Sequence, residues 1–124
     1  MEKLVLSATD EFPSVILDKS SSKFEIAGIS IPHNSSDFYS PLVDWFKKYC
    51  KNPNPETVLE CKLDYFNTSS HKYLTEIFKV LDTLHHNGGK VKILWYYNVE
   101  DEDMKLIGQE LSHFLELPFE FKEF

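Results

Sequence analysis

The sequence predicts a mixed α/β fold, with helices that cover mainly one face of a β-sheet. The chain has 124 residues and is 42% hydrophobic, which suits one buried core and is too short for two ordinary domains. After the first third, strand-like and helix-like periodicities alternate, which indicates crossovers between parallel strands in the middle of the sheet. Two central strand segments keep a polar or half-polar face, whereas a sheet buried on both faces reads as continuous apolar runs.

The first third of the chain is typical of short strands in a meander or hairpin. Its strand-like segments are KLVLSAT, SVILD and KFEIAGISI, at residues 3–9, 14–18 and 23–31. Pro13 and the serines at 20–22 separate these segments, and both residue types favour turns.

A helix is predicted from about Asn34, with Asn34, Ser35 or Ser36 as its N-cap. Pro41 predicts either a kink or a later start. The segment KNPNPE at 51–56 ends the helix. Its inward residues recur at helical spacing: Phe38, Leu42, Val43, Trp45, Phe46 and Tyr49.

Residues 57–66 and 90–98 alternate as the two central strands. The expected inward sets are Leu59, Cys61, Leu63 and Tyr65 in the first strand, and Val91, Ile93, Trp95 and Tyr97 in the second. The same alternation places Phe66, Leu94 and Tyr96 on the opposite face. These side chains form either an exposed apolar patch or a surface that the N-terminal strands or the tail cover.

The remaining elements are two helices and a possible edge strand. One helix carries an apolar stripe and stops at Asn87-Gly88-Gly89, a good C-terminal signal; the stripe is Tyr73, Leu74, Ile77, Phe78, Leu81 and Leu84. The last helix starts at about Asp101, with these residues inward: Met104, Ile107, Leu111, Phe114 and Leu115. Residues 117–124 resemble an edge strand.

The net charge of −7 argues against nonspecific binding to nucleic acid and favours protein partners. No apolar run approaches the roughly 18 residues that span a bilayer, and no signal-peptide core is present, so we expect a cytoplasmic chain without membrane insertion. Cys50 and Cys61 lack a CxxC spacing, and reduced, buried thiols are expected in such a compartment.

Catalytic and metal-binding patterns are absent from the sequence. His85 and His86 are adjacent on a helix and point in different directions. No glycine-rich phosphate-binding loop is present, and four glycines in total leave little room for one. We therefore expect no enzyme activity, no cofactor and no metal. A hydrolase that uses Ser70 and His71 is the weakest alternative, because adjacent residues at a helix start do not readily give nucleophile-to-base geometry.

A hydroxyl cluster marks the junction between residues 57–66 and the following helix. The cluster follows an asparagine and reads Asn67, Thr68, Ser69, Ser70. One N-cap explains one hydroxyl, and the capping box is missing, since no Glu or Gln stands three places after any of the three. A phosphoryl group suits a helix start, where His71 and Lys72 add positive character. The cluster is either a regulated phosphate acceptor or a cap.

The segment LDYFNTSSHKYLTEIFKVLDTLHHNGGKVKILWYYNVEDEDMKLIGQEL, residues 63–111, resembles the SiaC family of bacterial regulatory phosphoproteins. The fold of that family is similar to STAS and anti-anti-sigma-factor domains. Asn67-Thr68-Ser69-Ser70 is the most specific element, and WYY followed by acidic residues and Gly108 supports it. The resemblance implies a single STAS-like regulatory domain over residues 1–124.

The resemblance also implies a mechanism. Thr68 would be phosphorylated by a kinase with a histidine-kinase-like ATPase fold and dephosphorylated by a PP2C-type phosphatase. The unphosphorylated form would bind an effector such as a diguanylate cyclase, and so raise cyclic di-GMP and promote biofilm. Anti-anti-sigma proteins typically have Asp-Ser-Ser-Gly here; Asn67 and Ser70 depart from that pattern and favour the SiaC branch.

The loop around Thr68 is the expected partner-binding site, with Ser69 or Ser70 as the cap that shapes it. Its other residues are Asn67, Ser69, Ser70, His71 and Lys72. The main alternative is a constitutive protein-binding module of the same fold, in which Thr68 is only a helix cap. Surface aromatic residues would also suit a homodimer.

Overall fold

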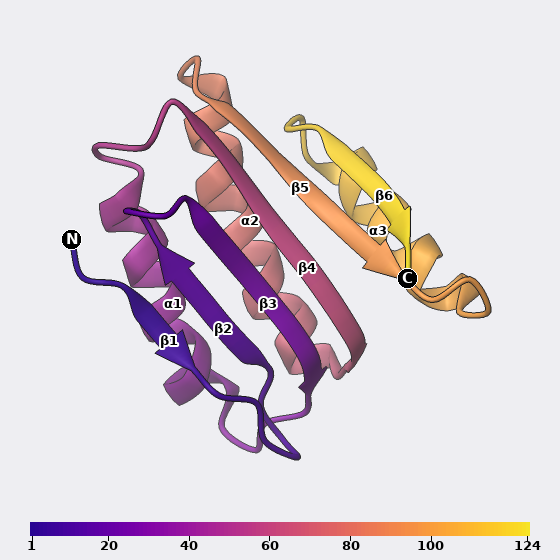
Figure 1. Cartoon of the computed structure of the whole chain (residues 1–124). Coiled ribbons are helices and arrows are strands. Elements are labelled where there is room, and N and C mark those ends of the chain that lie inside the picture. Colours follow the sequence, from indigo (N-terminus) through magenta and orange to yellow (C-terminus); the bar gives the residue numbers. More distant parts are fainter.

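The computed structural model describes all residues, 1–124, as one six-stranded sheet with three helices (Figure 1). The strands are β1 (Leu4–Leu6), β2 (Ser14–Asp18), β3 (Lys23–Ser30), β4 (Glu56–Phe66), β5 (Lys90–Tyr97) and β6 (Phe119–Glu123). The helices are α1 (Ser35–Tyr49), α2 (Thr68–His86) and α3 (Glu102–Phe114).

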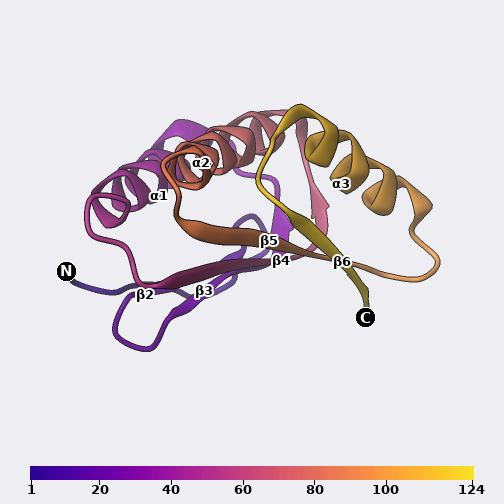
Figure 2. The same ribbon diagram turned by 90° about the horizontal axis from the view of Figure 1, so that it is seen from above.

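The order of the strands in the sheet is their order along the chain. β1, β2 and β3 form an antiparallel meander, and β3 to β6 pair in parallel through α1, α2 and α3. Each parallel strand from β4 to β6 lies beside the preceding one, and the sheet grows in the same direction each time. Because such crossover connections are right-handed, every helix then lies on the same face of the sheet. Figure 2 shows all three helices on one side of the sheet, which confirms the predicted fold.

The core lies between the sheet and the helices and is rich in aromatic side chains. Phe24 of β3 packs against three aromatic residues of α1, with ring centroids 5.0 Å apart for Tyr49 and 5.9 Å for Trp45. The inward sets predicted for β5 and for the stripe of α2 are buried, apart from the half-buried Tyr73. The long strands therefore bury mainly the face that the helices cover.

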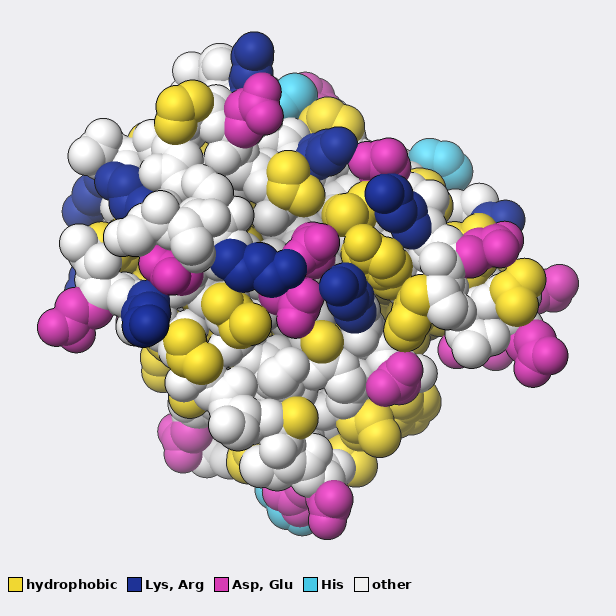
Figure 3. Space-filling model, in the orientation of Figure 1, with side chains coloured by type: hydrophobic (Ala, Val, Ile, Leu, Met, Phe, Trp, Pro, Cys, Tyr) yellow, Lys and Arg dark blue, Asp and Glu magenta, His cyan; other side chains and the backbone are white.

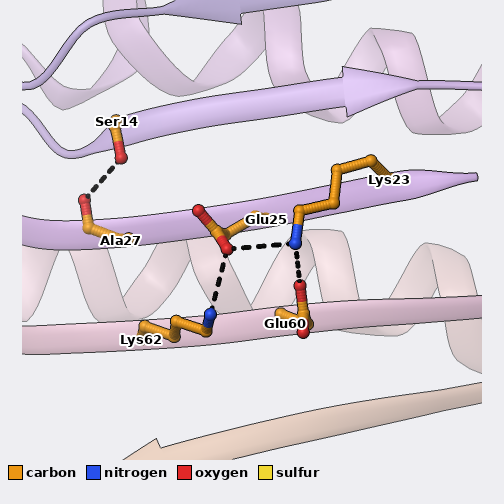
Figure 4. Close-up of polar contacts among 6 residues, drawn as sticks. All are labelled: Ser14, Lys23, Glu25, Ala27, Glu60 and Lys62. Atoms are coloured by element: carbon orange, nitrogen blue, oxygen red, sulfur yellow. Dashed lines mark hydrogen bonds and ion pairs between the residues drawn. The ribbon is translucent and has the colours of Figure 1, made fainter. Parts of the chain in front are cut away.

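The helix-free face is crossed by a row of paired charges (Figures 3 and 4). Lys23 Nζ lies 2.6 Å from Glu60 Oε2 and 3.4 Å from Glu25 Oε2, and Lys62 Nζ lies 3.2 Å from Glu25 Oε2. Because it is costly to take such charges out of water, they disfavour the packing of another sheet on this face. The polar face predicted for β4 is thus confirmed.

A β-bulge reverses the predicted faces at the end of β4. Gly28 pairs with Leu63 and Ile29 pairs with Tyr65, so Asp64 is an extra residue. Tyr65 is therefore 57% exposed on the outer face, while Phe66 is buried and meets Trp95 edge to face. Strict alternation cannot reveal an inserted residue, so the placements of Tyr65 and Phe66 were wrong. Leu94 is also buried and Tyr96 half-buried, which leaves no exposed patch of these three.

Three further differences concern the ends of elements. α1 starts at Ser35 with Asn34 as its N-cap and runs through Pro41, so it has no later start. β1 covers only Leu4–Leu6, less than the predicted strand. Phe114 was expected inward but is 86% exposed, because α3 ends at this residue and the extended backbone at Leu115 turns the next side chain inward.

Both cysteines are free thiols, as predicted. Cys61 is buried, whereas Cys50 is only half-buried at the C-cap of α1. Burial raises the pKa of the Cys50 thiol to about 11 and also raises that of Cys61, so both are protonated at neutral pH. None of the helices is both long enough and apolar enough to cross a bilayer.

Candidate functional site

The hydroxyl cluster lies at the carboxyl end of β4, where α2 begins and the end of β3 is close. The backbone amide of Asn67 donates to the carbonyl oxygen of Ser30, at 3.0 Å. Asn67 is the N-cap of α2, because its Oδ1 accepts from the amide of Ser70 at 2.9 Å. The expectation that a hydroxyl residue caps this helix was therefore wrong, and asparagine does so with the same physical effect.

Ser70 is fully buried and fastens the first turn of α2 to the sheet. Its hydroxyl donates to the carbonyl oxygen of Ser30 at 3.0 Å and lies 2.8 Å from Ser30 Oγ. Ser30 Oγ also shares a short hydrogen bond with the hydroxyl of Tyr39 in α1. Burial raises the pKa of Tyr39, so its hydroxyl stays protonated within this chain of hydroxyls. Ser70 was expected to belong to the partner-binding surface, but it is fully buried beneath that surface.

Ser69 is exposed, and its hydroxyl connects the first turns of two helices. It donates to Asn67 Oδ1 at 3.1 Å and lies 2.6 Å from the hydroxyl of Ser35. Ser35 is the first residue of α1 and is buried. The starts of α1 and α2 are therefore held side by side.

Thr68 differs from its two neighbours. It is the first residue of α2 and is exposed. The side-chain hydrogen bonds of the loop involve Asn67, Ser69 and Ser70, and none of them uses the hydroxyl of Thr68. A transferable proton on an exposed, unengaged hydroxyl is what a phosphate acceptor needs.

The electrostatic setting of Thr68 favours an anion. α1 and α3 have acidic residues in their first turns, Asp37 in one and Glu102 and Asp103 in the other, whereas α2 has none. The positive end of the α2 dipole is therefore not compensated. Exposed Lys72 and half-buried His71 follow in the same turn, and the ring of His71 stacks on Phe66.

Sequence reasoning missed Ser30, Ser35 and Tyr39. Ser30 is a polar residue at an inward position of β3, which was the available signal for a buried hydroxyl in need of a partner. Asn34 precedes α1 as Asn67 precedes α2, and its Oδ1 accepts from the amide of Asp37 at 3.3 Å. The occurrence of an asparagine directly before a hydroxyl residue at both helix starts was visible in the sequence.

Comparison with known proteins places this arrangement in a family. The model of the SiaC family regulatory phosphoproteins matches residues 6–124. The chain belongs to the SiaC family. The resemblance predicted from residues 63–111 is confirmed, and it extends over nearly the whole chain.

Similar proteins come from Pseudomonas aeruginosa. An uncharacterized protein of strain UCBPP-PA14 is 26% identical over 119 residues, which cover 96% of this chain and 94% of that protein. The solved structure of SiaC has a TM-score of 0.91 at 24% identity and covers all of both chains. SiaC in complex with the diguanylate cyclase SiaD, which it activates, has a TM-score of 0.92 at 25% identity and covers 98% of this chain and 99% of that one.

Proposed function

We propose that this SiaC-family chain is a non-catalytic partner switch in which phosphorylation of Thr68 controls binding to an effector. The observation that carries this proposal is that Thr68 alone in its cluster has an exposed hydroxyl free of hydrogen bonds. The whole of residues 1–124 acts as one regulatory unit.

The neighbouring hydroxyls are poor acceptors for physical reasons. Phosphorylation of Ser70 would place a charged group in a site with no exposure and break its hydrogen bonds to Ser30. Phosphorylation of Ser69 would break its hydrogen bonds to Asn67 and Ser35. Modification of Thr68 breaks no hydrogen bond of the loop.

The phosphoryl group acts through charge at the surface. Near the start of α2 it is stabilised by the helix dipole, so the fold tolerates it. A partner docked over Asn67, Ser69, His71 and Lys72 would have to bury about −1.5 to −2 charges, at a cost of several kcal/mol unless it supplies compensating cations. The unphosphorylated form is therefore the one that binds the effector.

The effector class is a diguanylate cyclase, supported by the solved complex of SiaC with the cyclase SiaD. The chain then regulates cyclic di-GMP synthesis and biofilm formation. A kinase with a histidine-kinase-like ATPase fold adds the phosphoryl group, and a PP2C-type phosphatase removes it. The alternative was a constitutive protein-binding module in which Thr68 is only a helix cap. Asn67 already caps α2, so capping does not explain Thr68.

The test uses immobilised Thr68→Ala and Thr68→Glu chains to capture proteins from extracts of the native host. GTP is then added to the washed resin, and cyclic di-GMP is measured. We expect synthesis on the Thr68→Ala resin and little on the Thr68→Glu resin. Equal synthesis on both would refute the switch. Thr83→Glu, which adds the same charge at an exposed site in the last turn of α2, is the control and should behave like wild type.

Peptide mapping of the chain purified from its host with phosphatase inhibitors tests the acceptor itself. A single phosphoryl group on Thr68 is expected. A phosphoryl group on Ser69 instead would contradict the assignment from hydrogen bonding.

A further inference from the structure

Exposed apolar side chains gather where the parallel strands end. Tyr65 at the end of β4 is 57% exposed, Val99 after β5 is 63% exposed, and Phe124 after β6 is 53% exposed. Ligands of open α/β sheets bind outside the carboxyl ends of the strands. We call this region the carboxyl-edge surface, formed by Asp64, Tyr65, Asn98, Val99, Glu100, Asp101 and Phe124.

A hollow of about 370 Å³ opens in the carboxyl-edge surface. Its walls come from the end of β4, the β5–α3 connection and the C-terminal residue: Leu63, Asp64, Asn98, Glu100, Asp101 and Phe124. Figure 3 shows acidic side chains over the β5–α3 connection, at the right of the helix-free face. The hollow thus combines apolar walls with carboxylates.

The carboxylates of the hollow have no cationic partner within the chain. The ion pairs of the molecule include Glu25, Glu60 and Glu120 but neither Asp64, Glu100 nor Asp101. The carboxylate of Asp101 accepts one hydrogen bond, from the amide of Met104, as the N-cap of α3. The charges that cross the sheet are satisfied internally, whereas those of the hollow are available to a partner.

We propose that the carboxyl-edge surface binds a protein segment that inserts an arginine or lysine side chain into the hollow and lays apolar side chains on Tyr65 and Val99. This inference rests on the proposed role as a protein-binding switch and adds the chemistry of the partner. Charge complementarity sets orientation and association rate, and the apolar contacts supply affinity.

Other occupants fit this surface less well. No group of histidine, cysteine and acidic residues is arranged to hold a metal ion. A second copy related by a two-fold axis would bring a second set of the same carboxylates into the interface and would supply no cation from this surface. A small polyamine would pair with the carboxylates and leave Tyr65 and Val99 exposed.

The test is a titration followed by ¹⁵N-edited NMR. The probe is a short synthetic peptide in which arginine alternates with leucine and tyrosine, and a peptide with glutamate in place of arginine is its control. We expect amide shifts at Asp64, Tyr65 and residues 98–101 with the arginine peptide, and none with the glutamate peptide. Shifts centred elsewhere, no binding, or equal binding of spermidine would overturn the proposal.

Variants separate this surface from other acidic sites. The double variant Asp64→Asn and Glu100→Gln should weaken binding of the arginine peptide about fivefold, with its binding losing most of its salt dependence. Glu110→Gln, at an exposed position of α3, should leave the affinity unchanged. Equal affinities of the double variant and wild type would contradict the proposal. The titration uses unphosphorylated chain, so failure of the Thr68 switch would not alter its result.

Discussion

Neighbouring hydroxyls in one turn have different physical roles. Asn67 caps α2, Ser69 joins it to α1, Ser70 anchors it to β3, and Thr68 is left exposed. Three side chains with the same hydroxyl group therefore differ in their exposure and in their hydrogen bonds. The division of roles is testable by single substitutions.

The role of Asn67 as cap predicts that alanine substitutions at two adjacent positions differ in their effect on stability. Asn67→Ala should lower the free energy of unfolding by about 1 kcal/mol, whereas Thr68→Ala should change it by less than about 0.5 kcal/mol. Thr68→Glu should raise it by about 0.3–1 kcal/mol through the helix dipole. Urea unfolding measures all three. A loss of about 1 kcal/mol for Thr68→Ala would restore threonine as the cap.

The buried hydroxyl of Ser70 makes a separate prediction. Ser70→Ala removes two hydrogen bonds to Ser30 and should lower the free energy of unfolding by about 1–3 kcal/mol. Ser36→Ala, at an exposed position of α1, is the matched control and should stay within about 0.5 kcal/mol of wild type. Similar effects of both variants would show that the buried network does not stabilise the loop.

Among the elements, α3 depends on one close approach to the sheet. A Cβ atom added at Gly108 would lie 2.6 Å from the indole of Trp95 and 2.9 Å from the ring of Phe121. The same indole donates to the carbonyl oxygen of Met104 at 3.0 Å. Glycine in a helix costs about 1 kcal/mol relative to alanine, so this position is set by packing and not by helix propensity.

Gly108→Ala should therefore destabilise the protein although alanine is the better helix former. Overpacking costs about 1–3 kcal/mol, which exceeds or offsets the gain in propensity. Thermal unfolding should show a lower Tm for Gly108→Ala, while Glu110→Ala on the exposed side of α3 should not lower it appreciably. A higher Tm for Gly108→Ala would mean that Trp95 moves aside easily.

The charged row on the sheet makes stability depend on pH. Desolvation tends to raise the pKa of Glu25, but Lys62 and Lys23 outweigh it, and the net pKa is lowered. A lowered pKa adds stability above the ordinary carboxyl pKa, and this stability is lost as the pH falls through the lowered value. Glu25→Gln should thus be less stable than wild type at neutral pH. The difference should disappear in acid, as followed by urea unfolding at several pH values.

For the molecule as a whole, periodicity was sufficient to predict the fold and insufficient to predict the details of the site. Alternation in β4 and β5 and the stripe of α2 predicted which residues form the core. The bulge at Asp64 inserted a residue that no periodic pattern contains. The contact of Ser70 with Ser30 joins residues 40 positions apart, and only the packed sheet brings them together. Thr68 was selected by family resemblance, and its assignment as acceptor stays a prediction, which its exposure and its hydroxyl free of hydrogen bonds support.

The agreement between strand order and chain order has a consequence for synthesis on the ribosome. A chain that emerges from its N-terminus can add each strand to the edge of a sheet that already exists, without threading between earlier strands. The side-chain hydrogen bonds of the loop around Thr68 join residues between Ser30 and Ser70, within the part that emerges before β5. The hydrogen-bonded loop that carries the proposed acceptor is therefore assembled from early segments, whereas the carboxyl-edge hollow is completed only when Phe124 has been added.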